Sequence, residues 1–156
     1  QSKVVPVDMS KTCFKPTSTH TVPKMLAESA QGISDQDRSQ LIQSLGSAID
    51  EVDSLVTTKS NVPYGMTFLI ATSLKVLKEI DLSEGDTEAI AQEIQREILA
   101  GSDWADLSDE KRQQIYETCI VNAAIMIGLR ESNVEASMKR AREQAAQALA
   151  LFGIKN

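Results

Sequence analysis

A long apolar run in the last third of the chain constrains the fold most strongly. The segment YETCIVNAAIMIGL, Tyr116–Leu129, is almost free of charged residues but contains one cysteine and one asparagine. Such a run is typical of a buried helix, a membrane segment or the wall of a ligand pocket. It is shorter than the roughly 18–20 apolar residues that cross a bilayer, which argues against a transmembrane helix.

Two stripes run along this segment at helical spacing. They consist of Ile115, Cys119, Asn122 and Met126, and of Ile120, Ala123, Ala124 and Ile127. A helix that is apolar on both sides is typical of a central core helix with neighbours all round. Asn122 is then predicted to be a buried polar side chain, and a buried amide needs hydrogen-bond partners. Such an amide more often satisfies a helix end or a loop carbonyl than binds a ligand.

The composition also favours helices. Only three Phe, two Tyr and one Trp occur in 156 residues, so the core must be aliphatic and rich in alanine. Aromatic and β-branched residues are enriched in strands, which argues against a β-sandwich. The length suits one domain with a sizeable core.

Capping signals delimit the predicted helices. The predicted N-caps are Thr21, Ser34, Asn61, Ser108 and Ser132, the last in a capping box with Glu135. The helices are predicted over residues 22–31, 35–56, 62–80, 87–100, 109–129 and 133–152, with a single turn at 102–107. The sequence therefore predicts an all-α, single-domain bundle of five to six helices over residues 22–156.

Residues 1–21 are predicted to form an extended N-terminal tail. They are polar, punctuated by proline and without helical period. Phe14 is the predicted anchor of this tail on the bundle, with Cys13 as a further candidate.

The two cysteines, Cys13 and Cys119, are a candidate disulfide between the tail and the core helix. In an exported protein, closing so long a loop would remove roughly 4–5 kcal/mol of unfolded-chain entropy. The alternative is two unrelated thiols, with Cys119 acting as a small buried hydrophobe.

The charge distribution argues against a nucleic-acid partner. The net charge is −6, and residues 81–110 hold ten acidic residues against the single cation Arg96. Affinity for nucleic acids rests on neutralising phosphates, and the cluster Lys139–Arg142 is too small to reverse this balance.

The sequence holds no recognisable catalytic or metal-binding pattern. The single histidine, His20, lies in the predicted tail, and a Ser-His-Asp or Cys-His site would have to recruit it. No zinc spacing, Glu-x-x-His pair or Gly-rich phosphate loop occurs. The carboxylate pairs Glu93–Glu97 and Asp50–Asp53 indicate solvated helix faces, because glycosidase clefts are rich in aromatic residues. We therefore expect no enzymatic activity, no metal and no cofactor.

Trp104 is the single tryptophan and stands beside Asp103 and Asp106. The simpler interpretation is that its ring seals one end of the bundle. In the alternative, Trp104 and the two aspartates form an exposed interface. Tyr64, at the start of the third predicted helix, holds a comparable position. The carboxylates here lack the order of a calcium loop, and helix capping explains most of them.

Three motifs occur in a fixed order along the chain. They are FKP at Phe14–Pro16, SNV at Ser60–Val62 and W..L....RQQIYE from Trp104 to Glu117. Through them, residues 13–130 resemble a large uncharacterised family of exported bacterial all-helical proteins, classified as a domain of unknown function. The resemblance implies an all-helical domain and export to the periplasm or outside the cell. It carries over no catalytic residue, and the cysteine pair departs from the family pattern.

The start of the chain agrees with export. It begins with Gln1 and has neither an initiator methionine nor an apolar leader, as expected after cleavage of an export signal or in a trimmed chain. We expect an exported, non-enzymatic domain that contacts an unknown protein or envelope partner through residues 81–110 and the tail.

Two alternatives belong to other functional classes. The first is a carrier of a small apolar ligand in the bundle core, where Met66, Met126 and Met138 would suit an adaptable pocket. The second is an acidic inhibitor or immunity-type protein that meets a basic target.

Overall fold

The computed structural model describes residues 7–154, and every regular element in that range is a helix. The elements are η1 (Ser10–Thr12), α1 (Val22–Ser29), α2 (Asp35–Leu55), α3 (Val62–Lys78), α4 (Glu84–Ala100), α5 (Asp103–Asp106), α6 (Asp109–Glu131) and α7 (Glu135–Leu151). The predicted all-α single domain is confirmed. It has one α-helix more than the largest predicted number, because the turn at residues 102–107 forms the separate short helix α5.

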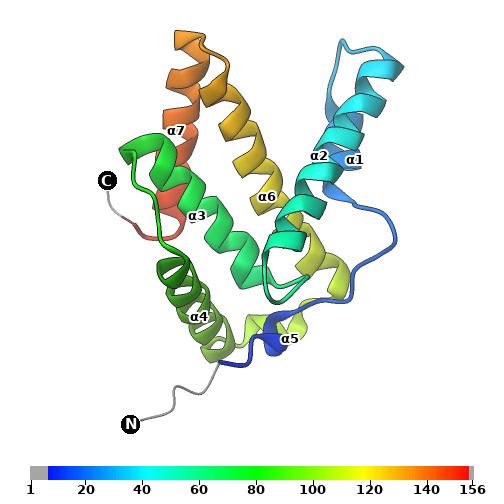
Figure 1. Cartoon of the computed structure of the whole chain (residues 1–156). Coiled ribbons are helices and arrows are strands. Elements are labelled where there is room, and N and C mark those ends of the chain that lie inside the picture. Colours follow the sequence, from blue (N-terminus) through cyan, green and yellow to red (C-terminus); the bar gives the residue numbers. More distant parts are fainter. Residues whose placement is uncertain (1–6, 155–156) are drawn as a thin grey trace.

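Helices α3, α6 and α7 form the centre of the molecule (Figure 1). Helix α6 packs against α1, α2, α3 and α7, and it buries Tyr116, Ile120 and Met126 almost completely. Buried alanines of α7, at positions 141 and 145, belong to the same core and let the helix backbones approach closely. In Figure 1 the α1–α2 hairpin stands to the right of α6, whereas α4 and α5 lie in the lower part.

The prediction of a buried Asn122 is wrong. Asn122 is exposed, Thr118 one turn earlier is also exposed, and Gln114 one turn before that is half-buried. These polar residues are spaced by four, so they form one solvent-facing line along α6. The buried polar residues of α6 are instead Gln113, 2% exposed, and Glu117, 1% exposed.

Side-chain caps fix where several helices begin. Ser34, Asn61 and Ser108 each accept a hydrogen bond from the backbone N–H three residues on, as predicted. The predicted capping box between Ser132 and Glu135 is wrong, because the Ser132 hydroxyl donates to the carbonyl of Leu129 instead. Helix α4 begins at Glu84, before the predicted start at residue 87, because Ser83 and Asp86 form a capping box there.

The tail follows the surface of the bundle over residues 7–21; its first six residues lie outside the described range. Phe14 is 7% exposed, and its ring centroid lies 5.3 Å from that of Tyr116. The Phe14 N–H donates to the carbonyl of Ser60 at 2.9 Å, and Cys13 forms an antiparallel bridge with Asn61. Phe14 therefore anchors the tail as predicted, and the turn η1 interrupts its extended course.

Candidate functional site

A cleft of about 730 Å³ lies between the end of the tail, α1, α2 and α6. Helix α2 supplies one stripe of its lining: Arg38, Ile42, Gly46, Ile49, Asp50 and Asp53. Apart from the adjacent pair Ile49 and Asp50, these positions recur every three or four residues and therefore share one face of the helix. Residues 16–20 of the tail line the cleft together with this stripe. We call this space the His20 cleft.

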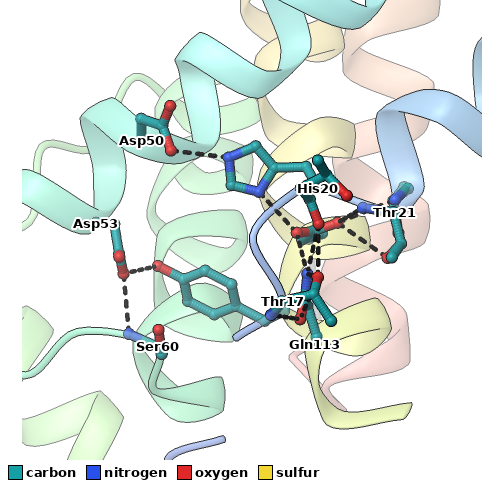
Figure 2. Close-up of polar contacts among 11 residues, drawn as sticks. Thr17, His20, Thr21, Asp50, Asp53, Ser60 and Gln113 are labelled. Carbon is teal, nitrogen blue, oxygen red and sulfur yellow. Dashed lines mark hydrogen bonds and ion pairs between the residues drawn. The ribbon is translucent and has the colours of Figure 1, made fainter. Parts of the chain in front are cut away.

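His20 joins the tail to two helices (Figure 2). Its Nδ1 lies 2.9 Å from Glu117 Oε2 on α6, and its Nε2 lies 2.8 Å from Asp50 Oδ1 on α2. The ring passes close to Gly46, where an added Cβ would lie 3.3 Å from His20 Cδ2. A glycine at this position therefore leaves room for the imidazole against α2.

Glu117 is the buried centre of the network. Its Oε1 accepts hydrogen bonds from the Thr21 N–H at 2.8 Å, the Val22 N–H at 2.9 Å and the Thr21 hydroxyl at 3.2 Å. Its Oε2 accepts from Gln113 Nε2 at 3.0 Å and faces the His20 ring. The carboxylate sits at the first turn of α1, where free backbone N–H groups and the helix dipole favour a negative charge. These partners compensate the burial of the charge.

Gln113 holds the tail one turn earlier on α6. Its Oε1 accepts from the Thr17 N–H at 2.9 Å, and its Nε2 donates to the Thr17 hydroxyl at 2.9 Å. The same amide donates to Glu117, so the two buried polar residues of α6 bind the tail as one connected network.

Tyr116 connects the network to α2. Its hydroxyl donates to Asp53 Oδ1 at 2.8 Å, and the same oxygen accepts from the Ser60 N–H at 2.9 Å. Burial raises the pKa of Tyr116 far above its usual range, and the hydrogen bond to Asp53 raises it further. The phenol is therefore a fixed hydrogen-bond donor rather than an acid that ionises at ordinary pH.

The environment of His20 favours its charged form. Burial alone would lower the pKa of His20, but the hydrogen bonds to Asp50 and Glu117 outweigh it, so the pKa is raised. Both ring nitrogens are already bound to carboxylates. In this arrangement neither nitrogen is available to act as a general base or to bind a metal ion. Within residues 7–154, no group of three or more His, Cys, Asp or Glu side chains is placed to hold a metal.

The structure leaves both cysteines as free thiols, so the candidate disulfide is not formed. Cys13 is part of the tail, and its sulfur lies 3.5 Å from the carbonyl oxygen of Lys59. Cys119 is 8% exposed and packs in the core cluster that includes Leu69 of α3 and Ala145 of α7. Each thiol thus belongs to a different part of the molecule. Burial raises the pKa of Cys119 to about 12.

Trp104 is buried and binds the tail. It is 9% exposed, its Nε1 donates to the carbonyl of Lys11 at 3.1 Å, and the Arg112 guanidinium carbon lies 4.0 Å from the ring centroid. The neighbouring Asp103 and Asp106 are exposed. Trp104 therefore does not present its ring on the surface.

Tyr64 is also buried, at 8% exposure, and its hydroxyl donates to Glu88 Oε2 at 2.6 Å. Neither Tyr64 nor Trp104 lines the His20 cleft.

The core methionines do not line the cleft either. Met126 is 1% exposed, and its sulfur lies 3.9 Å from the Ser73 hydroxyl in the packed centre of the bundle. Met66 and Met138 are half-buried.

The cleft was not predicted because its parts are distant in sequence. His20 and Glu117 are separated by 97 positions, and Gln113 and Thr17 by 96. The one local indication was a carboxylate, Glu117, near the start of an otherwise apolar run. A charged residue in such a run is either exposed or paired inside the protein.

Among the described residues, no helix combines the length and the apolar character that crossing a membrane requires. Comparison with known proteins found no match among curated proteins and none among solved structures. One family matches residues 3–155, nearly the full length of the chain. The chain therefore belongs to the Family of unknown function (DUF6683).

Proposed function

We propose that this protein is a non-enzymatic binding domain whose His20 cleft receives a short, extended peptide segment of a partner protein. The observation that supports this proposal is the stripe of α2 residues that lines the cleft together with the tail. From Arg38 to Asp53 this stripe is about 22 Å long at 1.5 Å per residue. An extended peptide of about six or seven residues has that length.

The lining suits a peptide with an apolar middle and a cationic residue. Half-buried Ile42 and Gly46 lie between the ends of the stripe, and Asp50 and Asp53 lie toward one end. The side chain of Asp50 is 74% exposed although it contacts His20, so a ligand cation can reach it. Apolar contacts supply affinity in such clefts, and a few placed polar groups fix the orientation of the ligand.

The polar network supports binding rather than catalysis. The groups that resemble catalytic residues, His20, Glu117 and Tyr116, all have protein partners that hold the tail in place. A general base must reach the proton that it abstracts, and both nitrogens of His20 are already engaged. The network thus gives the cleft a rigid wall.

The test is a selection of random heptapeptides displayed on phage against the folded protein. Binding of the selected peptides is then measured by calorimetry and mapped by backbone NMR. Ser18 is exposed and lines the cleft, so Ser18→Trp should fill the cleft without disturbing the core. We expect this variant to bind at least about tenfold more weakly, a loss of about 1.4 kcal/mol.

The matched control is Ser47→Trp, at an exposed position of α2 outside the cleft lining, which should bind like the wild type. Equal binding by both variants would refute the cleft as the site. Mass spectra that reveal cleaved peptides after incubation would refute the non-enzymatic part of the proposal.

Export to the periplasm or the cell exterior is part of this proposal. The support is the resemblance through FKP, SNV and W..L....RQQIYE. Fractionation of the native host should recover the protein with envelope or extracellular material, and recovery from the cytosol alone would contradict export.

A further inference from the structure

A groove runs along one face of α3, apart from the His20 cleft. Two hollows, of about 180 and 350 Å³, share the lining residues Phe68 and Ala71 and therefore adjoin along α3. The floor extends from Tyr64 to Val76 of α3, about 18 Å at 1.5 Å per residue. In Figure 1 this helix lies in front of α7, with α4 below it and α2 to its right.

The groove exposes apolar side chains at both ends. Leu55, at the end of α2, is 77% exposed, and Ile80, just after α3, is 42% exposed. Phe68 is half-buried between them. Single exposed apolar residues are ordinary, but a row of them along one hollow marks an interaction surface. The lining residues of the groove and of the His20 cleft do not overlap.

The rim of the groove is negatively charged. Among the described residues, the only charged ones lining the smaller hollow are Glu84 and Glu88 of α4. The larger hollow has two cations, Lys75 and Arg130. Each already pairs with an acid: Lys75 with Asp81 at 3.0 Å, and Arg130 with Glu79 at 3.1 Å. Glu84 and Glu88 therefore give the groove a net negative charge that a cationic ligand would complement.

We propose that this groove binds a basic amphipathic helix of a partner protein. A helix of about twelve residues matches the 18 Å floor. Apolar side chains on one of its faces would cover Leu55, Phe68 and Ile80, as in other complexes with a helix in a groove. Lysine or arginine beside that face would meet Glu84 and Glu88.

The rim charge disfavours the other occupants. A second copy that docked through the same groove would place its own glutamates against these, because a twofold interface pairs like surfaces. Nucleic acids and anionic lipid surfaces would be repelled in the same way. A cationic helix is the occupant that complements both the apolar floor and the acidic rim.

The test uses a fluorescent synthetic helix of about fourteen leucines and lysines, long enough for the floor. Its leucines occupy one face. A second peptide carries glutamate in place of every lysine. We expect the lysine peptide to bind with a fluorescence anisotropy change that weakens as salt is raised. NMR shifts should map to α3, to the start of α4 and to Leu55. The glutamate peptide should not bind.

Two variants test the two parts of the site. Leu55→Lys removes an exposed apolar contact, and Glu84→Lys reverses a rim charge at the first residue of α4. Each should weaken binding at least about tenfold, as for a central interface residue. Their matched controls are Leu151→Lys, at a leucine 84% exposed on α7, and Glu135→Lys, at the first residue of α7. Both controls should bind like the wild type.

Three results would overturn the proposal. Equal weakening by the controls would mean general charge attraction rather than a groove. Binding of the glutamate peptide would remove the electrostatic argument. Sedimentation that shows self-association through α3, lost in Leu55→Lys, would make a second copy the occupant.

Discussion

His20 is the only histidine of the chain, so its protonation can be followed without overlap. Its pKa is raised by Asp50 and Glu117, so the folded protein binds this proton more tightly than the unfolded chain. The stabilisation is complete below the unfolded value of about 6.5 and is lost as the pH rises through the folded value. We expect the free energy of unfolding to fall over that window, measured by urea titration at successive pH values.

His20→Gln is the control for this pH dependence. It removes the titrating group, so its free energy of unfolding should change less over the same window. Direct NMR titration of the imidazole provides the second check. A His20 pKa in the folded protein at or below that of an unfolded histidine would contradict the contacts of its ring with Asp50 and Glu117.

Two polar residues of α6 show what single-residue inference missed. Asn122 was predicted to be buried and is exposed, whereas Glu117 is buried and received no role. Helical spacing places both residues in or beside an apolar run, but it does not reveal which face is left uncovered. The partners of Glu117 come from the tail, nearly one hundred positions away, so the sequence around Glu117 does not predict them.

At the scale of elements, the contact between α3 and α6 depends on a glycine. A Cβ added at Gly65 would lie 2.7 Å from Cδ1 of Tyr116, whose hydroxyl is fixed to Asp53. The hydrogen bond to Asp53 and the contact with Phe14 restrain the ring, so we expect Gly65→Ala to destabilise the protein by about 1–3 kcal/mol. Thermal and urea unfolding measure the change.

Gly128 provides the matched control within α6. It is exposed, and an added Cβ would meet nothing within 4 Å. Gly128→Ala should therefore stabilise the protein by about 0.5–1 kcal/mol, the usual gain for alanine inside a helix. A stabilisation of similar size in Gly65→Ala would refute the close approach of the two helices.

The start of a helix was predictable from the sequence where a single side chain caps it. Ser34, Asn61 and Ser108 cap their helices because the hydroxyl or amide bonds a backbone N–H three residues on. Ser132 matches the same pattern but does not cap, because Val134 directly precedes α7. The box at Ser83 was missed because its partner is Asp86 rather than the usual glutamate or glutamine. Packing between helices was not predictable from such local signals.

At the scale of the whole molecule, the two thiols report on different motions. Cys13 is a half-exposed residue of the tail, whereas Cys119 lies in the α3–α6–α7 core. A thiol reagent should therefore label Cys13 first and Cys119 only at the rate of global unfolding. Within the folded protein, burial raises the pKa of Cys119, and the thiolate is the reactive form, so the buried thiol does not react appreciably without unfolding.

Cys13→Ser should remove the fast phase alone. Simultaneous labelling of both cysteines would contradict separate motions of tail and core. The intact mass of the protein, measured without reductant, should equal that of the fully reduced chain. A mass lower by the hydrogens that disulfide formation removes would contradict the free thiols.

The fold class followed from composition and helical spacing, because both act along the whole chain. The cleft, the groove and the hydrogen bonds of His20 could not be predicted in this way, because they depend on how helices distant in sequence pack together.

The hydrogen bond between His20 and Glu117 also has a consequence for biosynthesis. A ribosome releases the chain from its N-terminus, so the tail and α1 emerge long before α6. Thr17, His20 and Thr21 find their carboxylate and amide partners only after nearly one hundred further residues have been translated. Until then the nascent chain has no Glu117 on which to fix the start of α1, and this end of the protein completes its folding late.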